Sequence, residues 1–168
     1  LGTPDERCSA NVVNFATANA YFMFGQNLPP MPPPPPQVSG VLGAISSGRD
    51  NTVIANGNGL ATGMGIDVGF NSSLSWDSYA LYALGSLGVG FDMTLYKYAE
   101  DAHCDGIEGG FGANNWYLNG QVYAYGNINA GISGVCLGKP FDFTIVSASM
   151  AMLLQGKLPN PTFVYGGL

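Results

Sequence analysis

Alternation is strictest in the stretch LATGMGIDVGF, residues 60–70, where large or polar side chains alternate with small or acidic ones. Leu60, Met64 and Phe70 belong to the first series, and the series between them consists of Ala, Gly and Asp. A period of two is typical of a β-strand whose two faces meet different surroundings. The stretch therefore predicts a strand with an apolar face on one side and small or acidic residues on the other.

The same alternation continues through most of the chain. It recurs from Leu74 to Tyr98, with one bend allowed, and again from Trp116 to Ile132. Interior glycines weaken a strand, so a row of them on one face indicates close approach of another backbone, a bend or a bulge. We expect an all-β fold, or a mostly β fold with one short helix at most. Its long antiparallel, Gly-lined strands would form a curved sheet or a sandwich.

Two further segments bear on this fold. Residues 29–37 are a polyproline segment, which predicts an extended rod because proline fixes φ and lacks an N–H. The rod could dock in an aromatic groove of a partner, or it could cross the outside of the sheet as a strap, and we favour the strap. Residues 141–155 are apolar on both sides, which predicts a central strand covered on both faces. Within them, residues 147–154 also fit one or two helical turns.

Composition limits the function classes. The 168 residues suffice for one domain, and only 10% are charged, against about 25% in an average soluble protein. The formal net charge of -6 argues against nucleic acid as a partner and gives no support to binding at an anionic membrane surface. The chain lacks an initiator Met and stops within a β pattern. We therefore expect residues 1–168 to be a single β-rich module from a longer chain.

A polar loop over residues 99–115 holds most of the candidates for chemistry. Asp101, Asp105 and Glu108 could supply oxygen ligands to Ca²⁺, although their spacing is not that of an EF-hand and acidic loops are usually solvated. His103 lacks a neighbouring nucleophile signature and is expected to be an exposed loop residue. The sequence also lacks a P-loop, a zinc-protease helix motif and a nucleophile elbow. We expect no enzymatic activity and no cofactor other than this calcium.

Three cysteines make an odd count, Cys8, Cys104 and Cys136. In an oxidising compartment the simple interpretation is one disulfide and one leftover thiol. Cys104 and Cys136 flank one long β pattern, which favours that pair. The alternative is three buried free thiols.

An aromatic stripe is the candidate binding surface. Tyr117, Tyr123 and Tyr125 share the polar face of one strand with several Asn residues, and Trp116 faces the opposite way. Such a stripe can bind a glycan or a protein. It can equally be a half-buried surface that another part of a longer chain covers, and we favour this covered alternative.

Six segments, in chain order, share one pattern: Gly2-Thr3-Pro4-Asp5 with Arg7, Tyr21-Phe22-Met23, Leu28-Pro29 with residues 31–36, Gly90-Phe91-Asp92-Met93, residues 115–117 with residues 120–125, and residues 153–162. They resemble one region of large exported or surface proteins of Bacteroidota that are rich in β structure and have no assigned activity. The resemblance implies export into an oxidising compartment and an extracellular or cell-surface protein of several domains. It offers no catalytic residues.

These observations favour a structural function. We expect a non-catalytic assembly module of an exported cell-surface or extracellular protein, a filamentous one included. Its partners would be other segments of a longer chain or neighbouring subunits, because an uncovered sheet edge is an aggregation hazard. One alternative is part of an outer-membrane β-barrel, the only case in which a membrane is a partner. Another is a module that binds a glycan or a hydrophobic ligand through the aromatic stripe.

Overall fold

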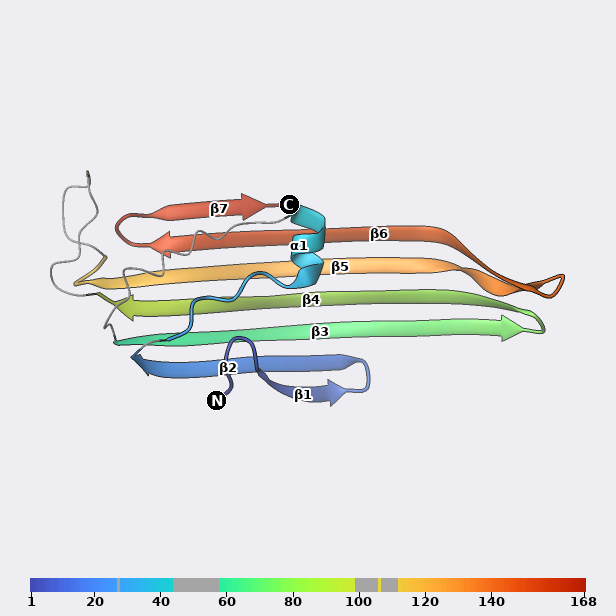
Figure 1. Ribbon diagram of the computed structural model, residues 1–168, viewed down its shortest axis with the longest axis horizontal. Coiled ribbons are helices and arrows are strands. Elements are labelled where there is room, and N and C mark those ends of the chain that lie inside the picture. The colour runs from blue at the N-terminus through green and yellow to red at the C-terminus, as the bar shows by residue number, and fades with distance from the viewer. Residues whose placement is uncertain (27, 44–57, 99–105, 107–111) are drawn as a thin grey trace.

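One antiparallel sheet accounts for nearly all regular structure in the computed structural model, which describes residues 1–26, 28–43, 58–98, 106 and 112–168. The strands lie side by side in chain order, so that each pairs only with its neighbours in sequence (Figure 1). This confirms the prediction of a mostly β fold with one short helix. The elements are β1 (Cys8–Val13), β2 (Ala16–Gln26), α1 (Pro36–Leu42), β3 (Asn58–Trp76), β4 (Tyr79–Lys97), β5 (Trp116–Cys136), β6 (Lys139–Leu158) and β7 (Phe163–Gly167).

The four central strands are long and are joined in part by very tight turns. β3 and β4 have 19 residues each, β5 has 21 and β6 has 20. Asp77 has a φ of 45° in the β3–β4 turn, and Leu137 and Gly138 have φ values of 52° and 76° in the β5–β6 turn. Positive φ is what two-residue hairpin turns require. The pattern predicted from Leu74 to Tyr98 is thus split by a hairpin turn rather than bent.

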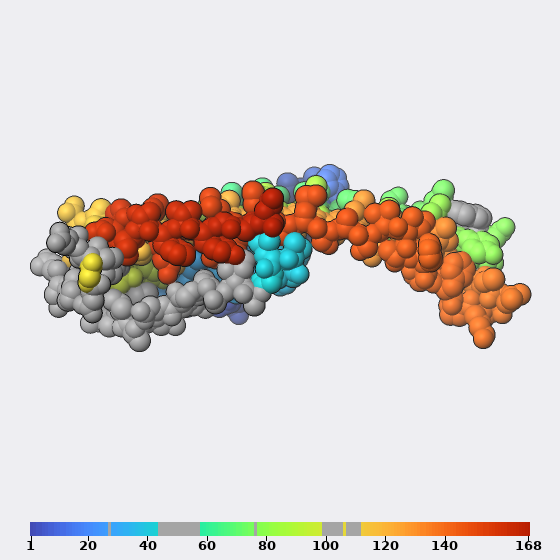
Figure 2. Space-filling model, turned by 90° about the horizontal axis from the view of Figure 1, so that it is seen from above, coloured from blue at the N-terminus to red at the C-terminus, as the bar shows by residue number. Residues whose placement is uncertain are grey.

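The sheet is a single curved layer with two unlike faces. Figure 2 shows it as a thin, bent slab with α1 on the concave side. We call this side the strap face and the opposite side the open face. Bulky apolar side chains dominate the open face, as the alternation in residues 60–70 predicts. β6 contains a bulge opposite Ala130 and Gly131, and a bulge bends its strand.

The predicted strap crosses the strap face. Residues 28–35, here called the strap, run over the sheet, and α1 follows them directly (Figure 1). Pro35 is the N-cap and Pro36 occupies the first turn, where proline is favoured because the missing N–H would have no partner there. The helix therefore includes the end of the predicted polyproline segment. Its Val38 is fully buried and packs in one cluster with Tyr123 and Leu153.

The prediction for residues 141–155 is wrong in part. They form a strand, not helical turns, but the strand is not covered on both faces. Phe143, Ile145 and Met150 are 64%, 55% and 73% exposed, whereas Leu153 is 1% exposed. Phe143 and Met150 lie on the open face, which no described element covers, Ile145 lies at the bulge, and α1 covers the opposite face near Leu153. Within the described ranges, no helix has the length and apolar character needed to cross a membrane.

Candidate functional site

A buried ion pair lies on the strap face, near the C-terminal end of β4. Arg7, just before β1, places Nη2 2.7 Å from Oδ1 of Asp92 on β4. The Asp92 side chain is fully buried, and that of Arg7 is 18% exposed. The Arg7 guanidinium also lies 5.1 Å from the centre of the Tyr21 ring, within reach of a cation–π contact. The pair joins the N-terminal segment to the fourth strand.

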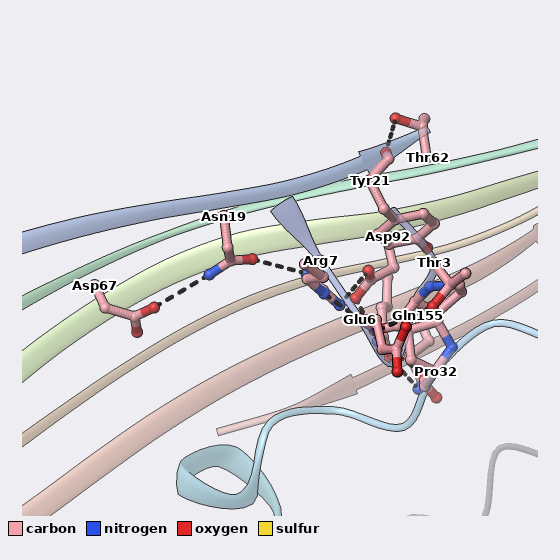
Figure 3. A network of polar contacts seen from close by, with 12 residues as sticks. Thr3, Glu6, Arg7, Asn19, Tyr21, Pro32, Thr62, Asp67, Asp92 and Gln155 are labelled. Atoms are coloured by element: carbon pink, nitrogen blue, oxygen red, sulfur yellow. Dashed lines mark hydrogen bonds and ion pairs between the residues drawn. The ribbon is translucent and has the colours of Figure 1, made fainter. Parts of the chain in front are cut away.

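Two glutamines extend this pair across the sheet and up to the strap. Gln121 on β5 lies directly opposite Asp92, and Gln155 on β6 lies directly opposite Gln121. The Gln121 amide donates to Oδ2 of Asp92 at 3.0 Å and to the carbonyl of Pro32 at 3.1 Å. The Gln155 amide donates to Oε1 of Gln121 at 3.1 Å. A buried carboxylate thus has a partner for each oxygen, and one strap carbonyl is bound to the same row (Figure 3).

A second branch leads from Arg7 along the sheet. Arg7 Nη1 donates to Oδ1 of Asn19 at 3.2 Å, and Asn19 Nδ2 donates to Oδ2 of Asp67 at 3.4 Å (Figure 3). The hydroxyl of Tyr125 donates to the other oxygen of Asp67. Together with the ion pair and the glutamines, this branch is the polar network of the strap face. Its carboxylates are acceptors for donors of this same chain, which is the behaviour of a structural network.

Glycines on the strap face make room for tyrosine rings. A Cβ built on Gly63 would lie 2.5 Å from the Tyr21 ring, and one on Gly88 would lie 2.3 Å from the Tyr125 ring. Real Cβ atoms do not approach so closely, so these rings lie against strand positions where a side chain would have no room. The sequence predicts close approach of another backbone, a bend or a bulge at the glycines, whereas at these two positions the approaching groups include tyrosine side chains.

Three of the four residues predicted to bind a ligand lie on this face. Tyr117, Tyr123 and Tyr125 are 7%, 4% and 9% exposed, and Trp116 lies on the open face at 36%. Tyr117 donates its hydroxyl to the carbonyl of Pro161 at 2.8 Å. The strap, α1 and the tight turn at Pro161 therefore occupy the positions that a glycan would need. This arrangement favours the covered alternative, with the cover supplied by this chain.

The other predicted site residues fall largely outside the described residues. These are His103, Cys104 and the three proposed calcium ligands, Asp101, Asp105 and Glu108. The calcium site and the Cys104–Cys136 disulfide therefore stay predictions. Cys8 and Cys136 are exposed, so the alternative of buried thiols is wrong for these two. No group of three His, Cys, Asp or Glu side chains suited to a metal was found among the described residues.

Two hollows, one on each face of the sheet, differ in the polarity of the residues that line them. On the strap face, a space of about 840 Å³ lies between the N-terminal segment, the strap and the sheet, lined by Arg7, Asn19 and Asp67 among others. On the open face, a depression of about 480 Å³ is lined almost wholly by apolar side chains, with Leu87 and Met150 among them. The first is built from groups that already hydrogen-bond one another. The second exposes hydrocarbon.

Sequence reasoning did not find the polar network. Arg7 and Asp92 are 85 residues apart, and Gln121 and Pro32 are 89 apart. The available signal was that Asp67 and Asp92 stand alone on glycine-lined strand faces, where an isolated carboxylate needs a partner. Comparison of the chain with protein-family models, curated proteins and solved structures gave no match. The resemblance to exported proteins of Bacteroidota stays a prediction.

Proposed function

We propose that the chain is a non-catalytic structural module of an exported cell-surface or extracellular protein, and that it works by assembling with further β structure along its edges. The observation that carries the proposal is the mismatch between long central strands and short outer ones. β1 has 6 residues and β7 has 5, whereas the four central strands have 19 to 21. β2, with 11 residues, and β7 therefore leave parts of β3 and β6 without a second strand partner among the described residues.

Two backbone edges are bare over several residues each. On β3, pairing with β2 ends at Val68, so residues 70–76 have β4 as their only strand partner in the described chain. On β6, β7 pairs with Leu153 to Lys157, so residues 139–152 have β5 as their only strand partner there. A bare edge presents a row of N–H and C=O groups to any strand that can add to it. The edge of β3 and most of that of β6 lie in the half of the sheet beyond α1 (Figure 1).

The strap face supports a scaffold role. Its carboxylates, amides and several tyrosine hydroxyls hydrogen-bond to one another or to strap carbonyls. Tyr96 donates to the carbonyl of Pro29 at 3.2 Å, and Gln121 donates to that of Pro32. Proline carbonyls in an extended segment have no donor of their own to pair with, so these side chains fix the strap. Such a network stiffens one half of the sheet while the other half stays open to neighbours.

Photo-crosslinking in the native host tests this assembly. A photoreactive phenylalanine analogue replaces Phe143 on the bare edge of β6 or Phe70 on that of β3. The matched control carries it at Leu137, which is 99% exposed in the β5–β6 turn and belongs to neither edge. We expect adducts to a neighbouring segment or subunit from both edges and none from the turn.

Sedimentation of the isolated chain is a second test of the proposal. If the chain sediments as a stable, soluble monomer with the β content of the assembled protein, it needs no neighbours and the proposal is wrong. Equal adducts from Leu137 and from the edges would also contradict it, because they would indicate random contact rather than edge pairing.

A further inference from the structure

The open face is bare hydrocarbon over most of its area. By register and alternation, the charged side chains that it carries in the described strands are Lys97 and Lys139. These lie at the two ends of the central strands, and the positions between them are uncharged. The bulky apolar members of this face that are at least 42% exposed include Phe22, Phe24, Met64, Ile66, Phe70, Leu74, Leu87, Val89, Val122, Ile128, Phe143, Val146, Met150, Met152, Leu154 and Val164.

The described part of the chain covers the polar face of the sheet and leaves the apolar face uncovered. In a water-soluble sandwich the apolar faces turn inward and the polar faces turn to solvent. Here the N-terminal segment, the strap and α1 all lie on the face that holds the Arg7–Asp92 pair, the two glutamines and the tyrosine hydroxyls. The covered face of the sheet is therefore the polar one. Strands with polar side chains inward and apolar side chains outward are the pattern of proteins whose surroundings are lipid.

The dimensions of the open face match a bilayer. β4 has 19 residues, and at about 3.4 Å per residue and a tilt of 45° it spans about 43 Å, against about 40–45 Å for a bilayer with its headgroups. The uncharged band from Leu81 to Leu95 spans about 34 Å on the same basis, against about 30 Å for the hydrocarbon core. The two lysines would then lie at the depth of lipid phosphates on opposite sides.

Aromatic residues accompany the lysines at both ends. Trp116 is the β5 neighbour of Lys97. At the other end, the Tyr79 and Phe141 rings lie 6.0 Å apart, close to Lys139 at the start of β6. Amphipathic rings and long basic side chains are enriched where a protein meets the membrane–water interface. An uncharged band with such residues at both borders fits a bilayer better than it fits the face of a second protein.

We propose that the open face lies in the hydrocarbon of a lipid bilayer, with β3 to β6 crossing it. This rests on the proposed function, because hydrocarbon cannot solvate a bare strand edge and the edges must pair with further strands. The strap face then lines the water-filled or protein-filled side of the sheet. Lys97 and Lys139 bind phosphates of the two leaflets.

Depth-dependent fluorescence quenching tests this directly. The chain is diluted from urea into vesicles of phosphatidylcholine and phosphatidylglycerol that carry nitroxide at a shallow or a deep acyl carbon. One variant keeps Trp116 as its single tryptophan. Two others lack both native tryptophans and carry Val89→Trp on the open face or Asn127→Trp on the strap face. Val89 is 52% exposed, and Asn127 is an exposed, hydrogen-bonded neighbour of Ser86.

The expected pattern has three parts. The deep nitroxide quenches the tryptophan at 89 several-fold more than the shallow one, Trp116 shows the reverse, and neither quenches the tryptophan at 127. A Val89→Lys variant should lose about 30-fold or more in partitioning into the same vesicles, whereas Asn127→Lys should lose little, because only the first places a charge in hydrocarbon. Circular dichroism checks that each variant is folded.

Each contrary result bears on one proposal. A folded chain whose tryptophan at 89 is shielded in a dimer and unquenched by either lipid overturns the bilayer proposal, since a second copy then covers the open face. Edge adducts from the crosslinking experiment without lipid quenching also overturn it and leave the assembly proposal standing. Lipid quenching without edge adducts contradicts the assembly proposal instead.

Discussion

The two faces of this sheet are built from the same strands and have opposite chemistry and opposite cover. Leu153 and Leu154 are neighbours on β6, yet the first is 1% exposed under α1 and the second is 51% exposed on the open face. On the strap face, most of the buried polar groups have a donor or acceptor from this chain, the hydroxyl of Tyr21 being an exception. On the open face, apolar groups remain uncovered. The contrast shows that the interior of this sheet cannot be inferred from hydrophobicity alone.

The largest expected effect is on the ion pair of the strap face. Replacing Arg7 with Met leaves the carboxylate of Asp92 buried without its cation, which typically costs about 3–5 kcal/mol of unfolding free energy. Urea unfolding followed by circular dichroism measures it. The double variant Arg7→Met with Asp92→Asn should recover much of the loss, because it removes the buried charge. A double variant as unstable as the single one would show that Arg7 acts through packing instead.

The next effect compares neighbours on opposite faces. Leu153→Ala should cost about 2–5 kcal/mol, because it opens a cavity under Val38 of α1. Leu154→Ala removes the same atoms from an exposed position and should cost under about 1 kcal/mol in water or mild detergent. Equal losses would mean that something already covers the open face under those conditions.

Two glycines on β3, Gly63 and Gly69, differ in the space that the strap face leaves for a side chain. A Cβ on Gly63 would lie 2.3 Å from Oδ1 of Asp92 and 2.5 Å from the Tyr21 ring, whereas one on Gly69 meets nothing closer than 4.0 Å. Gly63→Ala should therefore destabilise by about 1–3 kcal/mol through overpacking, and Gly69→Ala by far less. Thermal unfolding of the two variants side by side gives the difference. Similar melting temperatures would contradict the ring-over-glycine contact.

The smallest expected effect is on a hydrogen bond that holds the strap to the sheet. Tyr96→Phe removes the hydroxyl that donates to Pro29 and should cost about 1 kcal/mol, the usual value of one hydrogen bond. Tyr79→Phe on the open face is the matched control, since Tyr79 is 40% exposed, and it should stay within about 0.5 kcal/mol of the parent. Hydrogen exchange of the amide of Val38 in α1 should rise in the first variant and not in the second.

The fold was predictable where it depends on local alternation. Residues 60–70 show both faces of β3 without knowledge of any partner strand, because a period of two needs only the chain itself. The turn between β3 and β4 was not predictable in the same way. Its two residues, Asp77 and Ser78, are not an Asn-Gly or Asp-Gly pair, which is the pair typical of two-residue hairpin turns. A continuous apolar pattern therefore hid the end of one strand and the start of the next.

The candidate site was less predictable because it depends on register. Arg7 meets Asp92 only after three successive strand pairings place β1 to β4 in alignment. The tyrosines of the aromatic stripe were identified from the sequence, but whether they face solvent depends on a strap that arrives from between β2 and β3. A one-residue shift in any pairing would move all of these groups to the opposite face.

The position of the strap in the chain sets an order of folding events. The strap and α1 leave the sheet after β2, yet they contact Gln121 on β5 and Leu153 on β6, which are made some 90 to 120 residues later in synthesis. Each hairpin can form from adjacent residues as it emerges, because strand order follows chain order. The strap and α1 cannot make these contacts until β5 and β6 have formed. The strap is therefore the last segment to dock, and a docked strap indicates that the sheet beneath it has already formed.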